Sequence, residues 1–165
     1  MIIMRKITLS LFLLLFSACS FSQGDIVQGP FKIGGDDNVF IKNESDSNYP
    51  LALYFESDGK KFRVDSYEVN GSDPHVETVF FVKLKNIKNV IVLISWHQKH
   101  VAEDIDGNSY QVYGYKYQDG NLTINPLVRN DPALTGLDGE FDGEMLSFKY
   151  KDAAKIKQYL SSHYK

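Results

Sequence analysis

Cysteine is almost absent: Cys19 is the only one among 165 residues. A single thiol cannot form an intramolecular disulfide, so the folded part of the chain must be held by its hydrophobic core alone. About 140 residues follow the N-terminal segment, which is enough for one such core. Because Cys19 lies outside the expected domain, cysteine catalysis is not expected.

Long hydrophobic runs are also lacking. The apolar run from Ile7 to Phe16 is shorter than the roughly 20 residues that a transmembrane helix needs, and the longest later run, Val90–Ile94, has five. Arg5 and Lys6 precede the first run and small residues follow it. This three-part order is typical of a secretory signal peptide, which we predict over residues 1–22. The protein is therefore expected outside the cytoplasm, in the periplasm.

The end of this segment, Phe16-Ser17-Ala18-Cys19, resembles a bacterial lipobox, in which the cysteine becomes the lipid-bearing first residue. The sequence departs from that pattern at Phe16, where an aliphatic residue is usual. The alternative is ordinary cleavage after Ala18, Ser20 or Ser22, with Cys19 incidental. Lipidation of Cys19 would anchor a soluble domain to a membrane surface, and no other membrane contact is expected.

Positive charge is in short supply. Residues 1–22 hold two bases and no acid, so their removal leaves 16 basic and 21 acidic residues, a net charge of −5. Phosphate binding needs clustered positive charge, so nucleic acid is not expected as a partner. The acidic balance is compatible with a basic protein partner.

Catalytic motifs are missing as well. The sequence contains no Gly-x-Ser-x-Gly, no phosphate-binding glycine loop and no Ser-x-x-Lys. Ser95 lies within an apolar strand and is expected to be structural. We therefore expect neither an enzyme nor a cofactor.

What is present is a series of β signals. Residues 23–37 are rich in Gly and Asp and are expected to form a flexible lead-in to a single β-rich domain over residues 38–165. Apolar and alternating segments, separated by turn dipeptides such as Asp58-Gly59 and Asp119-Gly120, predict strands. These lie at 39–41, 51–55, 62–69, 76–84, 90–96, 110–117, 122–124 and 145–150.

The chain changes its period near the C-terminus. Asp152 is a good N-cap, and Ile156 and Leu160 follow helical spacing, which predicts a helix over 152–163 that packs on the sheet. Residues 126–136 predict a loop with a short helical turn. Together these elements predict an α+β fold: a mostly antiparallel meander of seven or eight strands with a C-terminal helix.

Three groups of residues could carry chemistry. His97 and His100, with Glu103, Asp104 and Asp106 close behind, have metal-ligand types, but we expect a solvated loop and no metal. Asp104-Ile-Asp106-Gly107 echoes a calcium loop, yet Tyr115 occupies the position of its last glutamate, so a turn is expected.

The acidic stretch Asp138, Glu140, Asp142 and Glu144 contains no base. Alternation would place these carboxylates on one side of an extended segment. They could serve glycoside hydrolysis, form a solvated loop, or contact a cationic partner.

The third group is a tyrosine row, Tyr113, Tyr115 and Tyr117, on one face of its strand. Tyrosine gives a large contact area, so this row is either a partner-binding surface or a half-buried face covered by the C-terminal helix.

These observations favour an exported periplasmic binding protein, an inhibitor or immunity protein that blocks a toxin or cell-wall hydrolase by protein contact. The alternative is a structural or accessory envelope lipoprotein without catalytic activity. A hydrolase using the acids around 103–106 or 138–144 is a third hypothesis.

Overall fold

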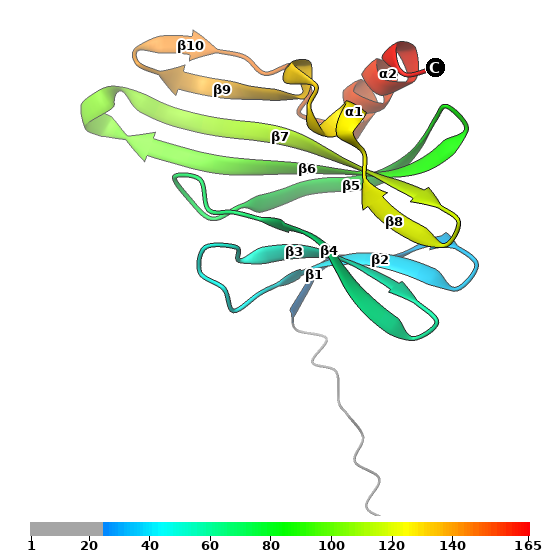
Figure 1. The fold of residues 1–165 in the computed structure, drawn as a ribbon. Helices are drawn as coiled ribbons and strands as arrows, with labels where there is room; N and C mark the ends of the chain where they lie inside the picture. The colour runs from blue at the N-terminus through cyan, green and yellow to red at the C-terminus, as the bar shows by residue number, and fades with distance from the viewer. Residues whose placement is uncertain (1–24) are drawn as a thin grey trace, which may run out of the picture.

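The computed structural model describes residues 25–165, which form ten β-strands in two antiparallel sheets and two α-helices (Figure 1). The signal peptide and the lipidation site at Cys19 lie outside these described residues. No helix within residues 25–165 is long and apolar enough to cross a bilayer. The predicted α+β class, mostly antiparallel sheet with a C-terminal helix, is confirmed.

The first sheet is a four-stranded meander in the order β1-β2-β3-β4. Its strands are β1 (Ile26–Gly34), β2 (Asp37–Asn43), β3 (Leu51–Ser57) and β4 (Lys60–Tyr67). The expectation of a flexible lead-in over 23–37 is wrong, because β1 pairs with β2 and the ordered fold begins well before residue 38. Ile33 is fully buried and Phe31 packs on the same core, so this short alternation of apolar residues outweighs the glycines around it.

The second sheet has the order β10-β9-β7-β6-β5, and β8 pairs with the far half of β7. Its strands are β5 (His75–Leu84), β6 (Ile87–His100), β7 (Ile105–Gln118), β8 (Asn121–Ile124), β9 (Thr135–Phe141) and β10 (Glu144–Leu146). The long β6–β7 hairpin projects beyond the first sheet (Figure 1). Residues 97–108, expected as a loop, are mostly the end of this hairpin.

A second departure concerns the glycine- and acid-rich segment 136–144, which forms the β9–β10 hairpin instead of a loop. Its glycines permit close approach, which explains why they occur inside strands. A Cβ on Gly136 would lie 2.4 Å from the Phe148 ring, and one on Gly139 would lie 2.6 Å from the Gly107 Cα. The predicted last strand over 145–150 is correspondingly short, and β10 ends at Leu146.

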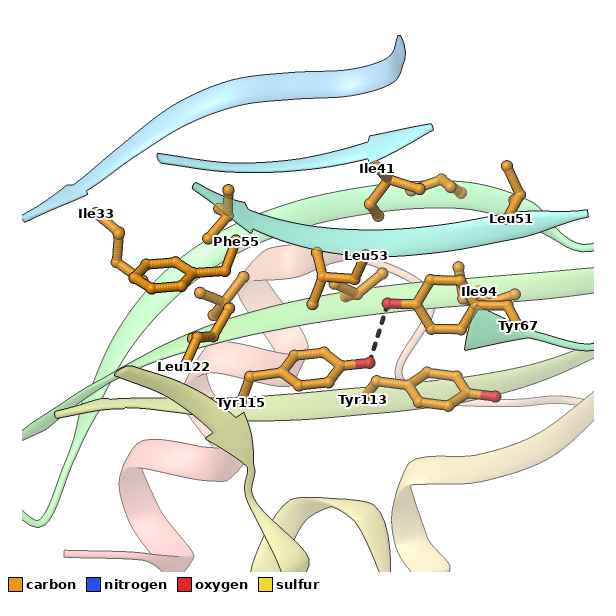
Figure 2. Packing of buried hydrophobic residues seen from close by; sticks show 14 of the residues in the cluster. Ile33, Ile41, Leu51, Leu53, Phe55, Tyr67, Ile94, Tyr113, Tyr115 and Leu122 are labelled. Atoms are coloured by element: carbon orange, nitrogen blue, oxygen red, sulfur yellow. Dashed lines mark hydrogen bonds between the residues drawn. The ribbon is translucent and has the colours of Figure 1, made fainter. Parts of the chain in front are cut away.

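The core lies on both faces of β6. Val90, Val92, Ile94 and Trp96 face the first sheet, and the alternate residues Ile91 and Leu93 face the C-terminal helix. A strand covered on both sides explains the continuous apolar run in the sequence. The tyrosine-bearing face of β7 also packs toward the first sheet (Figure 2).

The helices lie on the outer face of the second sheet or at its edge. Helix α1 (Pro126–Arg129) and the 3-10 helix η3 (Pro132–Leu134) form the predicted helical turn within 126–136. Helix α2 (Ala153–His163) is capped by Asp152, whose carboxylate accepts a hydrogen bond from the Lys155 amide at 2.8 Å. Its Ile156 and Leu160 are fully buried against the second sheet, as the sequence predicted.

Candidate protein-binding surface

Two hairpins end side by side at one end of the second sheet. The β6–β7 hairpin turns through the short 3-10 helix η2 (Val101–Glu103), and the β9–β10 hairpin turns at Asp142-Gly143. Their neighbourhood follows from the register, in which Asp106 of β7 pairs with Glu140 of β9 (Figure 1). Residues 103–106 and 140–144, far apart in the sequence, therefore form one surface.

This surface, which we call the acidic end, carries six exposed carboxylates on the two hairpins. They belong to Glu103, Asp104, Asp106, Glu140, Asp142 and Glu144. Lys99 lies on the neighbouring strand, and its Nζ is 3.0 Å from Asp106 Oδ2. The hydrogen bond and charge of Lys99 lower the pKa of Asp106. Lys99 offsets one of the six carboxylates, so the acidic end keeps a net excess of acids.

Apolar side chains stand among these acids. Met145 of β10 and Val101 of η2 are each 79% exposed. Met145 pairs directly with Glu140 in the register, so their side chains are cross-strand neighbours on one face. Single exposed apolar residues are common, but methionine adapts its shape to a partner more readily than other apolar residues. The acidic end therefore combines charge with exposed apolar area.

Asp138 plays a different part from the other predicted acids. It forms an ion pair with Lys151 at 2.6 Å and accepts a hydrogen bond from the Phe148 amide at 3.1 Å. The hydrogen bond from Lys151 lowers its pKa, and burial only partly opposes this effect. Asp138 therefore holds the segment before α2 against β9 instead of facing a partner.

The four predicted acids do not share one side. Asp138 and Glu140 lie on the same face of β9, since they are two residues apart in a strand. The turn at Asp142-Gly143 then reverses the chain, and Glu144 pairs with Phe141 on the opposite face. The expected alternation is wrong beyond Glu140, because the segment is a hairpin and not a single extended stretch.

The tyrosine row is not a partner surface. Tyr113 and Tyr115 are buried between the two sheets (Figure 2). The half-buried Tyr117 donates a hydrogen bond to Asp37 at 2.7 Å. The alternative, a face covered by the C-terminal helix, is wrong too, because α2 packs on the other face of the sheet. The strand alternation was predicted correctly, but the sequence could not show which layer would cover it.

These tyrosines belong to a polar network that links the sheets. The Tyr115 hydroxyl lies 3.0 Å from the Tyr67 hydroxyl and donates to Asp65 Oδ2 at 2.7 Å. Arg129 of α1 donates to the same oxygen at 2.7 Å and lies over the Tyr113 ring, 4.4 Å from its centroid. Burial raises the pKa of Tyr113 to about 12 and holds that of Tyr115 well above its usual value. The tyrosines are therefore un-ionised structural groups.

The histidines do not converge on a metal. His97 and His100 are three residues apart in β6, so their side chains point to opposite faces of the sheet. Within residues 25–165 no three His, Asp or Glu side chains gather closely enough to hold a metal ion. Asp104 has a left-handed backbone, with φ of 50°, and ends η2, while Asp106 already pairs within β7.

Ser95 is buried on the outer face of β6 and donates a hydrogen bond to Glu77 Oε1 at 2.6 Å, which is a structural contact.

No protein-family model matches the chain, and no curated protein or solved structure gives a significant match. The surface must therefore be interpreted from its own chemistry.

Sequence reasoning missed Met145 and Val101 as members of the surface. An exposed apolar residue leaves no periodic pattern, and the pairing of Asp106 with Glu140 is a tertiary feature. The sequence signal for this surface is the density of acids in both turns. The sequence alone does not show that the two turns lie side by side.

Proposed function

We propose that the protein is an exported periplasmic binding protein, an inhibitor or immunity protein that blocks a toxin or cell-wall hydrolase by protein–protein contact. The proposed contact surface is the acidic end. The observation that carries this proposal is the meeting of six exposed carboxylates with the exposed Met145 and Val101 on two adjacent hairpins.

The charge of this surface favours a basic partner. A local excess of carboxylates attracts a cationic surface over about 10 Å at ordinary ionic strength and speeds its association. Met145 and Val101 can be desolvated in the complex, which contributes to the lifetime of the bound state. In many protein interfaces, charged groups speed the association of the partners, and buried apolar groups slow the dissociation of the complex.

The placement of the acids fits contact better than hydrolysis. Glycoside hydrolysis needs two carboxylates that flank a bound sugar within a cleft. Glu140 and Glu144 lie on opposite faces of the β9–β10 hairpin, and neither residue lines the groove between the β3–β4 and β7–β8 hairpins. An exposed hairpin end instead fits into a cavity on another protein.

A capture experiment with the purified mature chain tests the proposal. Envelope extract is passed over immobilised wild-type protein and over the variant Glu140→Lys/Glu144→Lys/Met145→Ser. We expect a basic protein to be captured by the wild type and its affinity for the variant to fall at least about tenfold, since exposed charges each contribute about 0.2–1 kcal/mol. Asp36→Lys/Leu127→Ser, at exposed positions outside the acidic end, is the matched control and should bind as the wild type does.

The functional step is then tested with the captured protein. Added protein should suppress its toxicity or wall-degrading activity, and the triple variant should not. Equal capture by the variant would refute the acidic end as the contact surface. A captured protein that is unaffected by binding would favour the accessory lipoprotein instead.

A further inference from the structure

A second surface lies at the opposite end of strand β7. The β3–β4 hairpin and the β7–β8 hairpin lie beside each other there (Figure 1). Residues of both hairpins line a groove of about 610 Å³. Strand β7 spans 14 residues and a strand rises about 3.3 Å per residue, so the groove and the acidic end are separated by roughly 45 Å. A ligand in the groove would not contact the proposed surface for the basic partner.

The walls of the groove are two strand edges. In the described part of the chain, β4 pairs only with β3, and β8 pairs only with β7. An edge strand presents backbone N–H and C=O groups without a strand partner, which is a template for an added strand. Residues of both edge strands line the groove, so a polypeptide occupant could offer them backbone donors and acceptors in place of water.

The floor and rim of the groove are apolar. Phe55 and Leu122 are buried at its base, where the core between the sheets is reached from outside. Phe62 of β4 and Ile124 of β8 stand on the two walls and are 50% and 44% exposed. Apolar side chains of an occupant would cover these two residues and remove them from water.

The charge on the β4 wall is positive, in contrast with the acidic balance of the whole chain. Lys60 and Arg63 line the groove, and Asp58 is the acid among its lining residues. Further along β4, Asp65 is already engaged in its ion pair with Arg129. From that pair to Lys60 the edge of β4 offers a stretch of about five residues, the length of a short strand.

We propose that this groove binds an extended peptide segment of a partner protein, carrying acidic and β-branched residues, as an added strand along β4. The apolar side chains of the segment pack on Phe62 and Ile124, and the carboxylates that alternate with them meet Arg63 on the other face of β4. A fatty acid could cover the apolar floor and place its carboxylate near the same cations. It offers nothing to the two unpaired strand edges, so the peptide is the better fit.

The test uses the mature protein and a fluorescein-labelled hexapeptide, Val-Glu-Val-Glu-Val-Glu, followed by fluorescence polarisation. We expect saturable binding below about 1 mM. The variant Phe62→Asp/Ile124→Asp should bind at least tenfold more weakly, while Met145→Ser, at the acidic end, should bind as the wild type does. Both changed residues are half exposed, and circular dichroism verifies that the variant is folded.

Two further probes separate strand pairing from other binding. The same hexapeptide with alternate backbone amides methylated keeps its side chains and charge but loses donors, and it should bind at least tenfold more weakly. Amide hydrogen exchange in β4 should slow when the unmodified peptide is bound. The proposal is overturned if the unmodified peptide fails to bind, if the methylated peptide binds equally well, or if cis-parinaric acid occupies the groove in its place.

Discussion

The ion pair between Asp65 and Arg129 should contribute measurably to stability, because it joins the first sheet to α1 beside the core. The Asp65 side chain is only 13% exposed and the Arg129 side chain 33%, with the two charged atoms 2.7 Å apart. Arg129 also covers the Tyr113 ring. Replacement of Arg129 by methionine preserves the length and apolar stem of the side chain and removes the charge.

The expected cost follows from these contacts. A hydrogen bond to a charged group contributes about 1.5–3 kcal/mol, and a cation–π contact at a partly exposed site about 0.5–1 kcal/mol. Arg129 is one-third exposed, so solvent screening reduces the total. We expect Arg129→Met to lower the free energy of unfolding by about 2–3 kcal/mol, which corresponds to roughly 5–10 °C in Tm for a domain of this size.

Urea denaturation provides the assay. Trp96 is the only tryptophan and is buried between the sheets, so its fluorescence reports directly on this core. Arg63→Met, on an exposed position of β4, is the matched control and should change stability by less than about 0.5 kcal/mol. In a double-mutant cycle with Asp65→Asn we expect a coupling of about 1–2 kcal/mol. Additive effects of the two substitutions, or an equal loss from Arg63→Met, would refute the reasoning.

Three other outcomes are expected. Gly136→Ala should lower the free energy of unfolding, measured by urea denaturation, by about 1–3 kcal/mol, because the added Cβ would clash with the Phe148 ring. Adding Phe148→Val in the same chain should restore part of this stability. An unchanged denaturation midpoint would contradict the contact. The hydrogen bond from Lys151 lowers the pKa of Asp138, so the ionised Asp138 contributes fully to stability above the ordinary pKa of 3.8, and this contribution is lost as the pH falls below that value. Asp138→Asn should therefore reduce the fall in stability at acid pH. An acid limb of the stability–pH curve that is the same in the variant would contradict this prediction. If the lipobox is used, mass spectrometry of the mature protein should find an acylated Cys19. The Cys19→Ala variant should then be absent from the membrane fraction. An unlipidated mature chain that begins at Ser20 or later would exclude the lipid anchor.

The sequence was informative where one local pattern decides the outcome. The alternation in Tyr110–Tyr117, the Asp119-Gly120 turn and the capped helix after Asp152 are all present as expected. In each case propensity, turn chemistry and burial favour the same local structure, so tertiary packing did not change the secondary structure that the local sequence favours.

Prediction failed where two distant segments decide the outcome together. Segment 136–144 has the composition of a loop, and it becomes strands because its glycines pack against Gly107 and Phe148. Tyr113 and Tyr115 have the pattern of an amphipathic strand, and only the position of the first sheet makes them core. The candidate site was therefore predicted in part: the acids of both turns were found, but not the pairing that unites them.

The early start of β1 changes what a lipid anchor would do. A flexible lead-in through residue 37 would have let the domain range far from the membrane. Since β1 begins at Ile26, six residues separate Cys19 from the first strand, and the chain between Cys19 and Ile26 can span at most about 25 Å. Ile26 lies at the end of the first sheet opposite the β1–β2 and β3–β4 turns, so the groove would face away from an anchored terminus.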